Sequence, residues 1–301
     1  MEILSRYREP LTQAMDSLVG GPPSPILNMC RYHLGLSDGD GAPTGAVAGK
    51  MLRPALCLAM CEALDGDVRQ CLPAALSLET IHRSSLVFDD IQDRSSQRNH
   101  RPTIWGLWGA DQALNAGLAL SCYARLSLLG MPERGVSLGT SLEIQRLLEH
   151  TAIDLCRGQY LDLLYRTERP SLEQYLEMVR LKTGVLLGIA CEVGVMVAGD
   201  DDRRQAARQF GEALGIAFQL QDDVLGAWGD PAVTGKAADD LQRGLSAVGL
   251  IRACDGAPAT VYRLVLEWTQ RAQRMLSGLA LPDRWHGTLV EVTEALAVRS
   301  A

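Results

Sequence analysis

Apolar residues recur at three- and four-residue spacing along most of this chain. The segments with this spacing are rich in Ala, Leu, Glu and Arg, which favour helices. Only 5% of the residues are aromatic, and alternating runs of β-branched residues are scarce. The pattern therefore predicts an all-α fold without a strand array. The longest predicted helices cover residues 51–64, 72–93, 111–129, 142–165, 172–198 and 203–225.

Clusters of Gly, Pro and Asp separate these segments. They occupy residues 20–25, 38–45, 131–135 and 229–231, where they indicate loops. Neither a repeat of fixed period nor a sharp change in composition divides the chain. We therefore predict a single domain, residues 1–301, built as a large helical bundle.

The chain is acidic, with a formal net charge of -7 and a pI of about 5.3. This balance argues against a nucleic-acid partner, because such proteins usually present a basic face. The longest apolar run, residues 184–199, is interrupted by Glu192 and predicts a buried core helix rather than a transmembrane segment. The start of the chain lacks the pattern of a secretory signal, and the eight cysteines form no CxxC pair. We expect a cytoplasmic protein with reduced core thiols.

The first chemically informative cluster is Asp89-Asp90-Ile91-Gln92-Asp93, at the end of an apolar segment. On a helix, Asp89 and Asp93 lie one turn apart on the same face. Like charges at this spacing repel unless a cation lies between them. Arg98 follows closely and brings a positive charge near the carboxylates.

A second pair, Asp222-Asp223, also ends an apolar helical segment, and Lys236 follows it after a Gly-Asp-Pro turn. A single Asp-Asp pair is most simply a solvated helix end. Two pairs that both end strongly apolar helices are better explained by paired or metal-bound carboxylates, because isolated buried charge is costly. Oxygen ligands beside Lys and Arg suit Mg²⁺ bridging a phosphate group. Zinc is disfavoured, because no Cys/His ligand set accompanies the pairs.

Several short motifs run in a fixed order along the chain. They are AGKMLRP at 48–54, the first aspartate cluster with its upstream helix and Arg98 at 82–98, GQYLD at 158–162, KTG at 182–184, FQLQDD at 218–223, and the Gly-Asp-Pro and Gly-Lys steps at 229–236. In this order they resemble the motifs of the trans-isoprenyl diphosphate synthases, the polyprenyl synthetase family. The resemblance implies a helical bundle of the isoprenoid synthase type and, as is usual in that family, a homodimer. Residues 111–129 are a candidate part of its interface.

The resemblance also implies a reaction. An allylic diphosphate ionises to a carbocation and diphosphate, isopentenyl diphosphate attacks through its double bond, and a proton is lost. The protein must stabilise the departing anion and exclude water. By resemblance, Asp89, Asp93 and Asp222 are the main Mg²⁺ ligands, and Asp90 and Asp223 support them. The same comparison assigns the allylic diphosphate to Arg98, Lys182, Gln219 and Lys236, and isopentenyl diphosphate to Lys50, Arg53 and His82. It also makes Thr183 a substrate-binding residue. These roles require the two aspartate pairs to lie close together.

The chain departs from the family pattern at diphosphate contacts. Asn99 stands where a second arginine is usual, and that arginine normally contacts isopentenyl diphosphate. Gly226 replaces a common third aspartate, Leu118 replaces another aspartate, and the lysines expected within 237–246 are absent. These losses leave alternatives open: a class I terpene cyclase, a prenyltransferase with an acceptor such as an indole or a glycolipid, or a weakly active partner of another synthase. Because Lys50, Arg53 and His82 are retained, elongation is narrowly favoured.

Two residues just before the first cluster bear on product length. In the family, bulky side chains here shorten the product, because they floor the hydrophobic tunnel. Ser84 and Ser85 are small, so we predict room for a geranylgeranyl or longer chain. For His82, a buried structural histidine is the rival interpretation.

Overall fold

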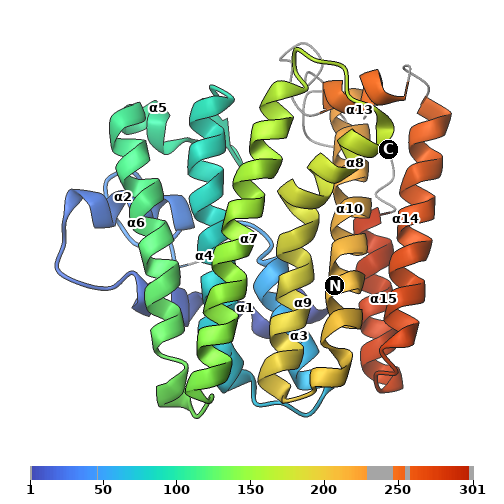
Figure 1. Cartoon of the computed structure of the whole chain (residues 1–301). Coiled ribbons are helices and arrows are strands. Elements are labelled where there is room, and N and C mark those ends of the chain that lie inside the picture. The colour runs from blue at the N-terminus through green and yellow to red at the C-terminus, as the bar shows by residue number, and fades with distance from the viewer. Residues whose placement is uncertain (1, 46, 229–246, 255–257, 298–301) are drawn as a thin grey trace. The chain divides into compact units, whose positions relative to one another are not determined.

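The computed structural model describes residues 2–45, 47–228, 247–254 and 258–297, which are mostly α-helical (Figure 1). The chain forms two compact units. We call residues 2–148 and 196–199 the N-terminal unit, and residues 149–195 and 200–301 the C-terminal unit. The predicted all-α class is confirmed. The prediction of one domain stays a prediction.

The N-terminal unit is organised around the long helix α4 (Val68–Gln92). This helix packs against α1, α3, α5 and α6. The other helical elements of the unit are α1 (Glu2–Leu18), α2 (Pro25–Leu34), α3 (Leu52–Ala63), α5 (Ile104–Trp108), α6 (Ala110–Leu129), the 3₁₀ turn η1 (Pro132–Arg134) and the first part of α7 (Leu138–Leu164).

A local signal sets the start of α4. The Asp67 side chain accepts a hydrogen bond from the backbone N–H of Arg69, which caps the start of the helix. Small and aliphatic residues in its first half are buried, and this burial drives its packing on α3 and α6. The helix ends at Asp93, so the first aspartate cluster lies in its last turn.

A tight hairpin follows α4. Its strands are β1 (Gln97–Arg98) and β2 (Arg101–Pro102), and they pair antiparallel. The two turn residues, Asn99 and His100, have φ values of 50° and 61°. Two successive left-handed residues are typical of a two-residue hairpin turn, whose twist matches that of the strands. The sequence pattern does not predict this hairpin.

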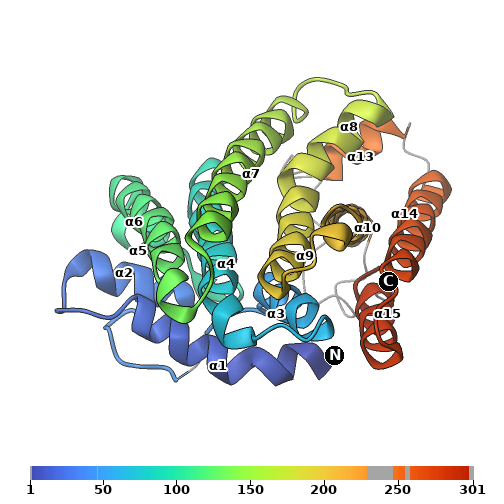
Figure 2. The same cartoon turned by 60° about the horizontal axis from the view of Figure 1, so that its bottom comes forward.

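The C-terminal unit is built around α10 (Arg204–Trp228), which packs against α14 (Pro258–Gly278) and α15 (Asp283–Ala297). Figure 2, in which α10 is viewed nearly end-on, shows it between α9 (Val185–Ala198) and α14. A Cβ on Gly211 of α10 would lie 2.3 Å from the carbonyl oxygen of Leu187. Glycine is therefore needed where α10 crosses α9 this closely. The remaining elements are the second part of α7, α8 (Leu172–Val179), the π-helical turn η2 (Arg180–Gly184), the 3₁₀ turn η3 (Asp201–Arg203) and α13 (Ala247–Ala253).

Most predicted helices match observed ones within a few residues. The segment predicted as one helix over 172–198 contains α8, the π-helical turn η2 and α9. In the described part of the chain, this stretch alone is long and apolar enough to cross a membrane, and 83% of its most apolar window is buried inside the structure. Burial of this kind fits the predicted core helix. The cytoplasmic location stays a prediction.

The cysteines follow the predicted pattern with two exceptions. Six are free and buried, as expected of core thiols. Cys122 on α6 and Cys156 on α7 are exposed, so the expectation of core thiols is wrong for them. Both residues lie on helical faces whose neighbours include exposed residues, and an apolar neighbourhood in sequence does not reveal which face a residue occupies.

Candidate active site

The first aspartate cluster has one buried and two half-buried members. Asp90 is buried, whereas Asp89 and Asp93 are half-buried. Arg98, on β1, donates from Nε to Oδ1 of Asp90 at 2.9 Å, and its Nη2 lies equally close. Burial raises the pKa of Asp90 to about 6, although the Arg98 charge opposes this rise. The expected grouping of Arg98 with these aspartates is confirmed, with Asp90 as its direct partner.

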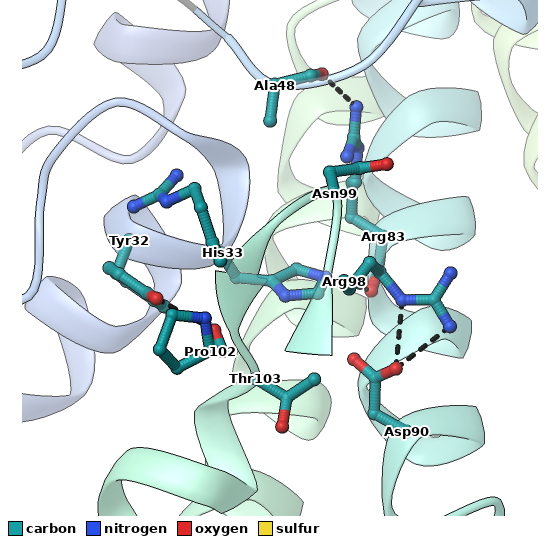
Figure 3. A pocket seen from close by; sticks show the side chains of 10 residues that line it. Tyr32, His33, Ala48, Arg83, Asp90, Arg98, Asn99, Pro102 and Thr103 are labelled. Atoms are coloured by element: carbon teal, nitrogen blue, oxygen red, sulfur yellow. Dashed lines mark hydrogen bonds and ion pairs between the residues drawn. The ribbon is translucent and has the colours of Figure 1, made fainter. Parts of the chain in front are cut away.

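A polar pocket lies next to this ion pair (Figure 3). Asn99, Ala48 and His33 line it together with Asp90 and Arg98. The Nε2 atom of His33 lies 2.9 Å from the carbonyl oxygen of Arg83. Burial, reinforced by the neighbouring arginine charges, lowers the pKa of His33 to about 3. This histidine is therefore neutral at physiological pH.

The residues predicted to hold isopentenyl diphosphate all belong to the N-terminal unit. Lys50 is exposed and precedes α3. The Nε atom of Arg53 is buried and has no hydrogen-bond partner among the described residues, and burial lowers the pKa of this arginine to about 10. Burial, followed by the charges of Arg53 and Arg83, lowers the pKa of His82 well below its usual value. A buried guanidinium with an unsatisfied N–H beside a neutral imidazole is suited to receive an anion.

The second aspartate pair repeats the arrangement of the first. Asp223 is buried and Asp222 is half-buried. The Tyr175 hydroxyl donates to Oδ2 of Asp223, and Gln219 Nε2 donates to Oδ1 at 2.9 Å. Burial raises the pKa of Asp223 to about 7, although both hydrogen bonds oppose this rise. The Oε1 atom of Gln219 accepts from the Thr183 hydroxyl at 2.8 Å, so one hydrogen-bonded chain joins α8, η2 and α10.

Lys182 lies in the π-helical turn η2. Its Nζ atom is 2.8 Å from Oδ2 of Asp162, and Arg166 Nη2 is 3.1 Å from the same oxygen. Lys182 is therefore held in an ion pair and is not a freely solvated helix lysine. Arg157, also on α7, pairs with Asp154 and not with Asp162.

Gly158 allows α7 to approach this turn closely. A Cβ on Gly158 would lie 2.4 Å from the backbone nitrogen of Lys182, a separation that real side chains do not reach. The GQYLD motif thus supplies both the glycine that admits the turn and the carboxylate that pairs with its lysine. π-helical turns of this kind are frequent at functional sites.

Sequence reasoning missed three residues that shape these groups. Tyr175 is fully buried and donates to Asp223, and Glu79 pairs with Arg83 at 2.7 Å inside the N-terminal unit. Only their spacing in the sequence could have pointed to them. Tyr175 precedes Lys182 by seven residues, and Glu79 and Arg83 are four residues apart on α4. Lys236 and residues 237–246 lie outside the described residues. The predicted closeness of the two aspartate pairs stays a prediction.

The types of ligand atom present indicate which metal ion these carboxylates can bind. No group of three or more His, Cys, Asp or Glu side chains in the described ranges is placed to hold a metal ion by itself. Mg²⁺ is usually bound through one or two carboxylates together with substrate phosphates and water. Asp89 and Asp93, one helical turn apart, fit this mode. A zinc site, which needs a closed set of protein ligands, does not fit them.

Comparison with known proteins gives consistent matches. Residues 44–275 match the family model described as "Polyprenyl synthetase". The chain is 35% identical over 254 residues to a geranylgeranyl diphosphate synthase of Mycobacterium tuberculosis, covering 83% of this chain and 71% of that protein. It is 41% identical over 207 residues to a (2E,6E)-farnesyl diphosphate synthase of Mycobacterium bovis, covering 68% of this chain and 56% of that protein. A crystal structure of a polyprenyl synthetase from Streptomyces coelicolor A3(2) is similar with a TM-score of 0.83 at 29% identity, covering 99% of both chains.

Proposed function

We propose that this chain, which belongs to the polyprenyl synthetase family of prenyltransferases, condenses an allylic isoprenoid diphosphate with isopentenyl diphosphate in a Mg²⁺-dependent reaction. The observation that carries the proposal is the arrangement shared by the two aspartate pairs. In each unit, hydrogen bonds hold the buried aspartate in place, and the half-buried aspartate is the preceding residue of the same helix. Neighbouring cations and amides complete a set of groups suited to diphosphate.

Each functional group then has a definite task. Asp89, Asp93 and Asp222 would bind Mg²⁺, which supplies Lewis acidity that favours departure of the diphosphate. Arg98, Lys182 and Gln219 would orient the allylic diphosphate and stabilise the charge that develops as the carbon–oxygen bond breaks. The salt bridge to Asp162 and the hydrogen bond from Thr183 hold two of these groups in place before substrate arrives.

Arg53 and His82 would receive the acceptor's diphosphate together with Lys50. The buried Nε of Arg53 supports this assignment, because a buried donor without a protein partner is costly unless a ligand satisfies it. His82, kept neutral, donates a hydrogen bond without adding charge. The diphosphate released from the allylic substrate can accept the final proton, so no protein base is required.

The reaction is tested by product analysis. The purified protein with Mg²⁺ and farnesyl diphosphate should yield a longer diphosphate only when isopentenyl diphosphate is also present. The variants Asp89→Asn and Asp222→Asn should each lower kcat about 10²–10³-fold, the scale for loss of one group that stabilises transition-state charge. Asp202→Asn, at an exposed position on η3, is the matched control.

One alternative retains a specific observation in its favour. Asn99 removes a cation that the family normally offers to isopentenyl diphosphate. A terpene cyclase of the same fold would need no such cation. Hydrocarbon or alcohol products that form without isopentenyl diphosphate would establish cyclisation and refute elongation.

Product length is the finer part of the proposal. Relatives named for farnesyl and for geranylgeranyl products match the chain comparably, so similarity does not separate them. We propose a geranylgeranyl-type product, because Ser84 and Ser85 are small. Ser84 is buried and donates to the carbonyl oxygen of Gly117 at 2.8 Å, so it faces α6. If Ser84→Phe leaves the longest product unchanged, Ser84 does not floor the tunnel.

We also propose a homodimer formed through α6. Four of its leucines, Leu114, Leu118, Leu126 and Leu129, expose 49–63% of their surface. An apolar stripe of this kind along one helix is expected where a second copy packs in a symmetric interface. Light scattering should give a dimer mass for the native chain and a monomer mass for Leu118→Glu. Leu266→Glu, at an equally exposed leucine on α14, should leave the mass unchanged.

A further inference from the structure

The hairpin after α4 carries an arginine close to the position of the missing one. Asn99 occupies the position where a second arginine is expected, but another arginine, Arg101, follows two residues later. Both residues line the polar pocket beside Asp90, and Asn99 is labelled there in Figure 3. The pocket therefore still has an arginine that the family motif does not assign to it.

The register of the hairpin aligns the two arginines. Arg98 on β1 is directly opposite Arg101 on β2. Residues directly opposite in an antiparallel pair present their side chains on the same face of the ribbon. Asn99 and His100 form the turn between them. Arg101 is thus placed on the face that carries Arg98.

The charges of the pocket are unequally compensated. Arg83 pairs with Glu79, and Arg98 pairs with Asp90. Arg101 has no carboxylate partner among the residues that the structure describes. The lining also contains His33, whose imidazole is neutral at physiological pH because its pKa is lowered. The excess positive charge of the pocket therefore resides on Arg101.

Arg101 is also held in a fixed position. Its Nη2 atom donates to the carbonyl oxygen of Ser37 at 2.8 Å, and its guanidinium lies 4.2 Å from the centre of the Tyr32 ring. The Tyr32 hydroxyl in turn donates to the carbonyl oxygen of Pro102 at 2.7 Å. A guanidinium has five N–H donors, so these contacts leave donors for an anion. A pre-positioned arginine loses less freedom when it binds a phosphate group.

We infer that this pocket receives a phosphoryl group of the acceptor diphosphate and that Arg101 supplies the cation absent at position 99. The inference rests on the proposed elongation reaction and names a residue that determines its acceptor affinity. Ala48 lines the same pocket and precedes the Gly49-Lys50 step, so the loop that carries Lys50 adjoins the pocket.

The first test separates the two substrates. Arg101→Gln should raise the KM for isopentenyl diphosphate about 10–100-fold, the change expected for loss of one charge-assisted contact. The KM for the allylic diphosphate should stay within about twofold, because Arg98 remains paired with Asp90. Arg263→Gln, at an exposed helix position in the C-terminal unit, is the control for loss of an arginine and should change neither KM.

The second test separates charge from structure. In the double variant Arg101→Gln/Asn99→Arg, an arginine returns at the family position but the contacts with Tyr32 and Ser37 do not. Recovery of at least half of the lost acceptor affinity, on a logarithmic scale, supports the inference. Thermal unfolding of the single and the double variant measures separately the stability lost with the Tyr32 and Ser37 contacts, because an arginine at position 99 does not restore those contacts.

Each other outcome is decisive. If the native chain elongates and Arg101→Gln leaves the acceptor KM unchanged, the inference fails and the proposed function stands. If both KM values rise together, or if Asn99→Arg restores nothing, Arg101 acts as a structural anchor and the inference also fails. If the native chain makes no elongated product, the proposed function fails first, and the assignment of an acceptor to the pocket fails with it.

Discussion

His33 makes the stability of this protein sensitive to mild acid. Its imidazole lies among Arg83 on α4 and Arg98 and Arg101 on the hairpin, and its ordinary pKa of 6.5 falls to about 3 in the folded state. Burial is the largest cause, and the three arginine charges add to it. The folded protein therefore keeps His33 neutral at pH values where the unfolded chain protonates it.

The sign and the size follow from proton linkage. Below pH 6.5 the unfolded state binds a proton that the folded state excludes, so the free energy of unfolding falls as the pH falls. One pH unit below 6.5 this costs about 1.4 kcal/mol, and the loss grows until the pH approaches 3. His82, whose pKa is also lowered, acts in the same direction. Asp90 acts oppositely: with its pKa raised to about 6, the folded state gains stability as the pH falls from about 6 to 4.

Urea denaturation at pH 7.5 and pH 5.5 isolates the contribution of His33. In His33→Gln the side chain stays neutral at both pH values and can still donate to the carbonyl oxygen of Arg83. His82 and Asp90 titrate in both proteins, so their effects cancel in the comparison. Between the two pH values the native chain should lose about 1.4 kcal/mol more than the variant. Equal losses would refute the reasoning, because they would mean that folded His33 takes up a proton as readily as the unfolded residue.

Three further predictions concern the C-terminal unit. Tyr175→Phe removes a donor from buried Asp223 and should cost about 1.5–3 kcal/mol in urea denaturation, and an unchanged midpoint would exclude the hydrogen bond. Gly158→Ala drives a Cβ into the backbone of Lys182 and should cost about 3 kcal/mol, whereas Gly139→Ala, which meets only open space and a distant serine hydroxyl, should cost nothing. Asp162→Asn leaves Lys182 and Arg166 without their carboxylate and should lower the free energy of unfolding by about 2–3 kcal/mol. It should also lower activity, whereas an equally destabilising substitution elsewhere in α7 should not.

The extent of the helices was predictable, but their internal irregularities were not. The apolar spacing of residues 72–93 identifies α4 because a buried stripe repeats with the helical period. The π-helical turn at Arg180–Gly184 leaves no such mark, because its residues would also suit an ordinary helix. It lies against Gly158 on α7, in a close contact between segments that no local pattern reports.

The positions of candidate site residues were predictable where the sequence pattern around them is uncommon. Two adjacent-aspartate pairs at the ends of apolar helices made Asp89 and Asp222 candidates, and the ordered motifs of the family suggested their role as Mg²⁺ ligands. Tyr175 and Arg101 were not predictable in this way, because tyrosine and arginine are common and their roles depend on what lies opposite them. Arg101 acquires its position from the hairpin register, and that register depends on two left-handed turn residues.

The two aspartate pairs show why neighbouring carboxylates at a helix end divide their tasks. Successive helical residues differ in direction by about 100°, so one member of each pair points into the protein and the other toward its surface. The inward member, Asp90 or Asp223, would be unfavourable as an isolated charge, and hydrogen bonds from Arg98 or from Tyr175 and Gln219 offset that cost. These bonds fix the helix end, and the outward member is thereby held at a set position without being buried itself. Under the proposed function, a metal-bound diphosphate would meet a carboxylate already in place, which would reduce the entropy lost on binding.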